Sequence, residues 1–180
     1  LKKAEEKAVE GSVNLAEIYQ EMAFALSRLG RVKEALTHVD KAIATEIGNK
    51  DELTVLKGHI ELENGNPFAA QEFFLEAVRD SNSPSNVYFR IAVSVYDNGY
   101  MQLAYKMFHT LFQSAPTDWK DGYSHMALCC KLINKKDEYL HYLKKACKLN
   151  PIEAKNVLGE YFPKGLEPEN YYNYIIKNKS

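Results

Sequence analysis

The sequence predicts an all-helical fold made of four copies of one helical hairpin. The main observation is a repeat that is clearest in residues 99–116, which open on a glycine, continue with small and large apolar residues at helical spacing, and close on a proline. Steps of 34 or 35 residues from Gly99 lead to equivalent turn residues, Gly30, Gly65 and Asn134. Self-similarity at this period indicates a repeat array, because one hairpin cannot bury its apolar face alone.

The second observation is the position of small residues within each repeat. Two apolar patterns of about 14 residues are separated by a tight turn. The first pattern has a small residue near its middle, which is Ala23, Gly58, Ala92 or Ala127. Small residues let two helix axes approach each other, and large neighbours fill the remaining space. Glycine or asparagine at the turn can adopt positive φ, which suits the end of a helix.

The spacing small–x2–large apolar–x3–Gly–x4–Ala–x3–aromatic–x2–Ala, closed by a proline, resembles the tetratricopeptide repeat (TPR) signature. The resemblance covers Ala16 to Pro151 in four copies, about three quarters of the chain. It implies a right-handed α-α superhelix, or solenoid, of four TPR-like hairpins with C-terminal capping helices. The usual tryptophan position is occupied differently in the four copies, by Tyr19, Thr54, Tyr88 and Tyr123.

The repeat boundaries divide the chain into consecutive segments. Residues 1–15 form an N-terminal helical segment, interpreted as the tail of a preceding repeat, and residues 152–180 supply the capping helices. The four repeats lie between them, at residues 16–50, 51–84, 85–119 and 120–151. We expect their helices near residues 14–29, 32–45, 51–64, 67–80, 84–98, 101–114, 118–133 and 136–149. Pro67 and Thr117 support two of these starts, since proline is tolerated at the first helical position and threonine caps helices.

The second repeat departs most from the pattern. Lys57 and Glu61 fall where apolar residues belong, which leaves two registers open for its first helix. The alternative register is shifted by one residue, with Leu53, Leu56 and Ile60 facing inward.

The last predicted helix, residues 170–177, carries a dense load of tyrosine and isoleucine. One interpretation is that this helix covers the open end of the stack. The other is that it docks a second copy or a partner, because an apolar patch of this kind is seldom left to water. A homodimer through the C-terminal helix is therefore one hypothesis.

The charge balance excludes several classes of partner. The 180 residues carry 23 basic and 24 acidic side chains mixed along the chain, for a formal net charge of −1. This balance gives no electrostatic case for nucleic acid or an anionic membrane. No uncharged run reaches the ~18 residues typical of a membrane-spanning helix, so we expect no membrane insertion.

The three cysteines, Cys129, Cys130 and Cys147, lie at or near predicted core positions of the fourth repeat. An odd number without a framework spacing argues against a disulfide-stapled fold. We interpret them as small buried apolar residues. Unpaired cysteines favour a cytoplasmic location. The chain begins at Leu1 without methionine, and a signal removed before Leu1 would instead allow the cell envelope.

The resemblance also implies a binding surface, because TPR proteins build a concave wall from the first helix of each repeat. The residues at or beside the matching positions are Gln20, Phe24, Val55, His59, Asn86, Phe89, Arg90, Val93, Tyr96, Ser124, Leu128 and Lys131. Large apolar groups among them suit an extended or helical partner segment, which Arg90 and Lys131 would orient. The wall lacks the lysine–asparagine set with which some TPR domains grip a chaperone's C-terminal carboxylate. The alternative is that a terminal helix of the same chain fills the groove.

The sequence shows no catalytic or cofactor-binding set. His125 and Cys129 stand four residues apart on one predicted helix and could face one metal ion, but a zinc site needs two more ligands. No phosphate loop, nucleophile elbow or paired acid is present. We therefore expect no catalysis, cofactor or metal, and predict a non-enzymatic protein–protein interaction scaffold that binds a protein or peptide. The alternative is a ligand-sensing or docking repeat domain of a larger enzyme or regulatory protein.

Overall fold

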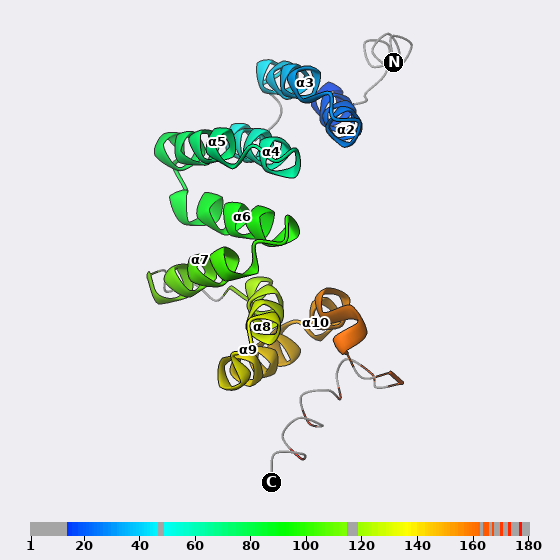
Figure 1. Cartoon of the computed structure of the whole chain (residues 1–180), viewed down its shortest axis with the longest axis vertical. Coiled ribbons are helices and arrows are strands. Elements are labelled where there is room, and N and C mark those ends of the chain that lie inside the picture. Colours follow the sequence, from blue (N-terminus) through cyan, green and yellow to red (C-terminus); the bar gives the residue numbers. More distant parts are fainter. Residues whose placement is uncertain are drawn as a thin grey trace. The chain divides into compact units, whose positions relative to one another are not determined.

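The computed structural model describes residues 14–46, 49–114 and 119–162, together with positions 164, 165, 167, 170, 173 and 177. Within these residues the chain forms helices joined by short turns (Figure 1). The elements are α2 (Leu15–Arg28), α3 (Val32–Ala44), α4 (Lys50–Glu63), α5 (Pro67–Asp80), α6 (Pro84–Asp97), α7 (Met101–Ser114), α8 (Gly122–Leu132), α9 (Lys136–Leu149), α10 (Pro151–Leu158) and the 3-10 turn η1 (Gly159–Tyr161). The predicted N-terminal segment and the tyrosine-rich helix lie largely outside the described residues.

The chain divides into two compact parts, Leu1–Ser94 and Val95–Ser180, called here the N-terminal part and the C-terminal part. In the N-terminal part α2 pairs with α3, and α4 pairs with α5. In the C-terminal part α8 pairs with α9. The expected helix bounds hold to within one residue at every end but the start of α8. That helix begins at Gly122, because a turn precedes it in which Gly122 N–H donates to Trp119 O (2.8 Å). The expected Thr117 cap lies outside the described residues.

The predicted turn residues adopt the left-handed backbone conformation, with φ of 72° at Gly30, 81° at Gly65, 84° at Gly99 and 62° at Asn134. At the first turn, Arg31 N–H donates to Leu26 O (2.9 Å), spanning the end of α2. This closure satisfies a carbonyl that the helix end leaves without an intrahelical partner. The equivalent bonds at the later turns run from Asn66 to Glu61 (2.8 Å), from Tyr100 to Val95 (3.2 Å) and from Lys135 to Cys130 (2.8 Å). The predicted turn geometry is confirmed.

Gly58, in the middle of α4, confirms the predicted close approach of helices within a hairpin. The ring of Phe74 on α5 lies against its backbone, and a Cβ built on Gly58 would stand only 2.3 Å from ring atom Cε1. A side chain at position 58 would fit only if the Phe74 ring moved away. Glycine at this position therefore lets α4 and α5 pack with an aromatic ring between them.

The first helix of the second repeat is buried on more than one side. Leu53 and Ile60 belong to a core cluster with residues of α2 and α3, and Leu56 packs against it, as the shifted register predicts. Thr54 and Gly58, which face inward in the unshifted register, are also buried. The reason is that α4 contacts α2 and α3 as well as α5, so both sets of residues face protein.

Polar partners accommodate the two residues that break the repeat pattern in α4. Lys57 Nζ lies 2.8 Å from Asp40 Oδ1 of α3 and 4.7 Å from the centroid of the Phe73 ring. Glu61 accepts a hydrogen bond from Asn66 Nδ2 (2.8 Å). The lysine stem can therefore cover apolar surface while its charged end remains paired.

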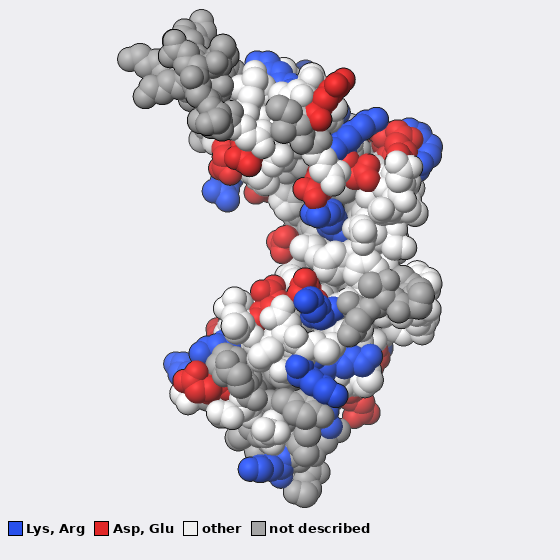
Figure 2. Space-filling view, turned by 180° about the vertical axis from the view of Figure 1, so that it is seen from behind, with Lys and Arg blue, Asp and Glu red and all other residues white. Residues whose placement is uncertain are grey.

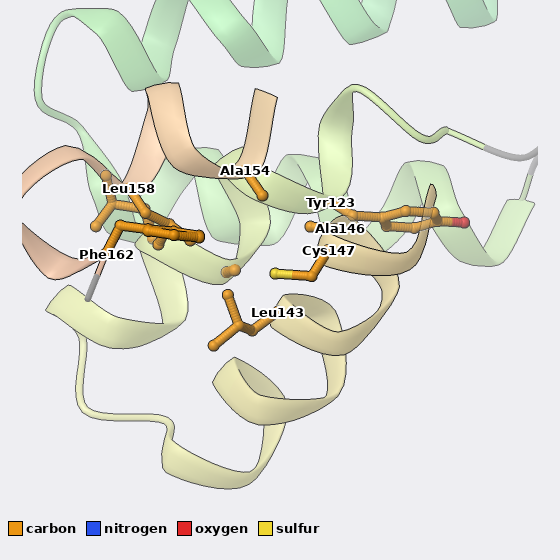
Figure 3. Close-up of a cluster of buried hydrophobic side chains, with 9 residues drawn as sticks. Tyr123, Leu143, Ala146, Cys147, Ala154, Leu158 and Phe162 are labelled. Carbon is orange, nitrogen blue, oxygen red and sulfur yellow. The ribbon is translucent and has the colours of Figure 1, made fainter. Parts of the chain in front are cut away.

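Apolar side chains from α8, α9 and α10 converge to form a core in the C-terminal part (Figure 3). The buried members of this cluster are Tyr123, Ala127, Leu128, Leu143, Ala146, Cys147, Ala154, Leu158 and Phe162. Because α10 contributes to the same cluster as both helices of the preceding hairpin, it covers one face of that hairpin.

All three cysteines are buried, as predicted, and none forms a disulfide. Burial raises the pKa of Cys129, Cys130 and Cys147 to about 12 in each case. The physical cause is that a thiolate loses its hydration in an apolar core. These residues therefore act as small core side chains.

Replacing Gly58 with alanine tests the close approach of α4 and α5. The added methyl group overlaps the Phe74 ring, so we expect the free energy of unfolding to fall by about 1–3 kcal/mol, despite the higher helix propensity of alanine. Urea unfolding followed by circular dichroism measures this loss. Combining the change with Phe74→Leu should recover part of it. A Gly58→Ala protein as stable as the parent would contradict the packing described.

Thiol labelling tests the burial of the cysteines. At about pH 8, a pKa near 12 leaves roughly one thiol in ten thousand ionised, and the thiolate is the reactive form. A chromogenic disulfide reagent should therefore react with none of the cysteines in the folded protein within minutes. In guanidinium chloride all of them should react. Fast labelling of the folded chain would show that these thiols are accessible.

Candidate interaction surface

A pocket of about 340 Å³ lies in the N-terminal part, between the start of α4 and the first turns of α6. Its lining residues are Asn49, Asp51, Ser83, Asn86, Val87, Phe89 and Arg90. Three of them, Asn86, Phe89 and Arg90, belong to the wall predicted from the sequence. The structure therefore brings these three residues together around one cavity.

Side-chain hydrogen bonds hold the rim of this pocket. Asn49 caps α4, and its side-chain oxygen accepts from the backbone N–H of Asp51 (3.0 Å). Asp51 Oδ2 in turn accepts from Ser81 Oγ (2.5 Å), and Ser81 Oγ accepts from the backbone N–H of Ser83 (2.9 Å). The loop that precedes α6 is thus tied to the first turn of α4.

An ion pair crosses from α6 to α4 beside the pocket. A guanidinium nitrogen of Arg90 lies 2.5 Å from Glu52 Oε1, and the two side chains are 50% and 42% exposed. The sequence indicated Arg90 as a residue that orients a partner, but it did not reveal that Glu52 matches its charge. The available signal was the spacing of the two residues, one repeat period of 34 residues plus four, which places them on neighbouring first helices.

The other predicted residues of the N-terminal part differ in accessibility. Val55 is buried, whereas Gln20, Phe24, His59 and Val93 are partly exposed. A hydrogen bond of 2.9 Å joins His59 Nδ1 on α4 to Ser94 Oγ on α6. This bond and the Arg90–Glu52 ion pair connect the same two helices.

The predicted residues of the C-terminal part are mostly engaged in packing. The ring of Tyr96 meets the His125 ring edge-on at a centroid distance of 4.8 Å, and burial raises the pKa of Tyr96 to about 12. Ser124 is 0% exposed, and Leu128 is buried in the cluster that α10 helps to form. Lys131 is exposed, and its Nζ lies 5.2 Å from the centroid of the Tyr139 ring.

This packing explains why fewer of the predicted wall residues are accessible in the C-terminal part than the sequence predicts. Leu128 shares its core cluster with Ala154 and Leu158, both of which belong to α10. A helix of the same chain therefore covers Leu128. The sequence predicted capping helices in residues 152–180 but not which of the predicted wall residues they would bury.

His125 and Cys129, the pair that could face one metal ion, each have another contact in the structure. His125 Nδ1 lies 2.9 Å from the Asp121 carbonyl oxygen, and Cys129 Sγ lies 4.0 Å from Met101 Sδ. Among the residues that the structure describes, no three His, Cys, Asp or Glu side chains form a group able to hold a metal.

Charged side chains of both signs are mixed on one face of the molecule (Figure 2). On the face shown in Figure 2, acidic and basic side chains lie interspersed among uncharged residues. Over the described ranges, no helix has both the length and the apolar character that crossing a membrane requires.

Two buried serines on first helices provide a matched test of local packing. Ser124 Oγ has no hydrogen-bond partner within the described part of the chain, whereas Ser27 Oγ donates to Glu63 Oε2 (2.5 Å) and accepts from Asn64 Nδ2 (3.0 Å). Ser124→Ala should raise the free energy of unfolding by about 1 kcal/mol, because it removes an unsatisfied buried hydroxyl. Ser27→Ala should lower it by about 1–3 kcal/mol. Urea unfolding of both variants measures the difference, and equal losses would contradict the assignment.

Comparison with known proteins places this geometry in a fold class. No protein-family model matches the chain, and no curated protein matches it either. The crystal structure of YrrB, described as a TPR protein with an unusual peptide-binding site, is similar over 83% of this chain and 76% of that one, at 17% identity and a TM-score of 0.51. A structure of PilF from Pseudomonas aeruginosa is similar over 92% of this chain and 77% of that one, at 14% identity and a TM-score of 0.54. At these identities the likeness shows the fold alone: the chain has the all-helical, TPR-like solenoid fold that its repeats predict.

Proposed function

We propose that this chain is a non-enzymatic interaction module that holds a segment of a partner protein against the first helices of its N-terminal repeats. The observation that carries the proposal is the pocket between α4 and α6, which gathers Asn86, Phe89 and Arg90. Helix-lined grooves bind peptide segments by burying a few anchor side chains and by hydrogen bonding to the peptide backbone.

The chemistry of the pocket suits such a segment. Phe89 is partly exposed, so a bound apolar group would remove the rest of its ring from water. Asn86 is exposed, and its side-chain amide can both donate to and accept from a peptide unit. The rim hydrogen bond that Ser81 Oγ donates to Asp51 Oδ2 ties the loop before α6 to α4, the two helices between which the segment would lie.

The proposed contact surface is narrower than the surface predicted from the sequence. It keeps the accessible residues of the N-terminal part, which are Gln20, Phe24, His59, Asn86, Phe89, Arg90 and Val93. It omits Val55, Ser124 and Leu128, whose side chains are buried. The similarity to YrrB, which is described as having a peptide-binding site, supports a peptide or protein segment as the partner class.

Selection from a random peptide library displayed on phage tests the proposal. Peptides enriched on the parent protein should lose at least about tenfold in affinity for the Phe89→Ala variant, since a partly buried aromatic anchor contributes more than about 1 kcal/mol. Phe68→Ala is the matched control, because Phe68 on α5 is 85% exposed and does not line the pocket. Fluorescence titration measures the affinities, and circular dichroism checks that each variant is folded.

Two outcomes would argue against the proposal. One is that no peptide is enriched above an unrelated helical protein. The other is that enriched peptides bind the Phe89→Ala and Phe68→Ala variants equally well, which would place their site elsewhere on the molecule.

A further inference from the structure

The charged groups around the pocket nearly cancel one another. Asp51 lines the pocket, and Arg90, which also lines it, is paired with Glu52. Two carboxylates against one guanidinium give a formal sum of −1. Lys50, the other charge in this turn of α4, interacts with Asp80.

The two helices that begin at the pocket supply the opposite sign. Asn49, which caps α4, and Asp51 in its first turn line the pocket, as do Asn86 and Val87 in the first turn of α6. A helix N-terminus is equivalent to roughly half a positive charge. The first turn of α6 has no acidic residue to offset this partial charge. Two such termini offset the formal charge of −1 from the side chains and bring the total charge at the pocket close to zero.

A pocket without net charge disfavours a charged occupant of either sign. A carboxylate or an ammonium group that enters loses hydration, and no net opposite charge replaces that hydration. An uncharged side chain avoids this cost. The partly exposed ring of Phe89 offers apolar contact, while Asn86 and Ser83 offer neutral hydrogen-bonding groups.

We infer that the pocket selects an uncharged residue of the partner segment and that the Arg90–Glu52 ion pair sets this selectivity. This inference rests on the proposed function and specifies its partner more closely. The volume of about 340 Å³ is at the low end of ligand pockets, so it suits one side chain with its adjoining peptide unit.

The role of the ion pair leads to opposite effects of two substitutions. Glu52→Gln leaves Arg90 unmatched, so the pocket becomes more positive and should accept aspartate or glutamate. Arg90→Gln leaves Glu52 beside Asp51, so the pocket becomes more negative and should accept lysine or arginine. Both side chains are about half exposed, and neither substitution is expected to disturb the fold.

The test uses a peptide enriched on the parent protein and three derivatives of it. Each position of this peptide is first substituted in turn. The position that contacts the pocket is the one whose substitution changes the affinity for the parent protein but not for the Asn86→Ala variant. That position is then occupied by glutamine, glutamate or lysine, and affinities are measured by fluorescence titration at low salt. The parent protein should bind the glutamine peptide about two- to five-fold more tightly than either charged peptide.

The substitutions should then move the preference in opposite directions. Arg90→Gln should remove the penalty against lysine, and Glu52→Gln should remove the penalty against glutamate. Arg31→Gln is the matched control, because Arg31 forms a similarly exposed ion pair with Glu34 on α3 and does not line the pocket. It changes the net charge of the protein by the same amount as Arg90→Gln and should leave the order of the three peptides unaltered.

The results separate this inference from the proposed function. If the parent binds the lysine or the glutamate peptide as tightly as the glutamine peptide, the inference is wrong while the binding module stands. A shift in the same direction for Arg90→Gln and Glu52→Gln also overturns it. If no peptide is enriched at all, the proposed function fails and this inference fails with it.

Discussion

The closure of each first helix by a residue in the left-handed conformation is the constraint on which the described hairpins depend. At Gly30 the chain turns within three residues, and the bond from Arg31 N–H to Leu26 O completes the end of α2. The second helix of the repeat then returns along the first, and small residues such as Gly58 can meet a ring on the facing helix. A longer or looser connection would leave the relative position of the two helices undefined. The pocket residues depend on this closure, because they sit on helices whose positions the hairpins set.

The second repeat shows how a departure from the repeat pattern can serve the fold. Lys57 and Glu61 replace apolar residues, yet Asp40 and Asn66 provide polar partners for them. The helix α4 therefore has contacts of two kinds, apolar toward the core cluster and polar toward its flanks. At its N-terminus the same helix carries Asp51 and Glu52, the acidic residues beside the pocket. Polar groups along α4 therefore have two roles: some hold the helix in the N-terminal part, and others lie beside the pocket.

Periodicity predicted what each repeat determines by itself. The turns at Gly65 and Asn134 follow from local backbone geometry. The close contact of Gly58 with Phe74 follows from residue size. Both can be inferred from the residue types alone. The Arg90–Glu52 pair did not follow, because several charged side chains lie within reach of one another and only their conformations decide which of them meet. Capping helices after Pro151 were predicted, but the burial of Leu128 against α10 was not, because the docking of a segment outside the repeat depends on packing that periodicity does not describe. The sequence therefore predicted a set of wall residues but not which of them are accessible.

The near cancellation of charge at the pocket has a kinetic consequence. Fast association of proteins usually relies on fields that reach about a Debye length into solution and guide the partner inward. A neutral site generates little such guidance, so encounters with it would occur at the rate of unassisted diffusion and would respond weakly to ionic strength. Partners would then be distinguished by their dissociation rates, which buried contacts at Phe89 and hydrogen bonds at Asn86 would lower.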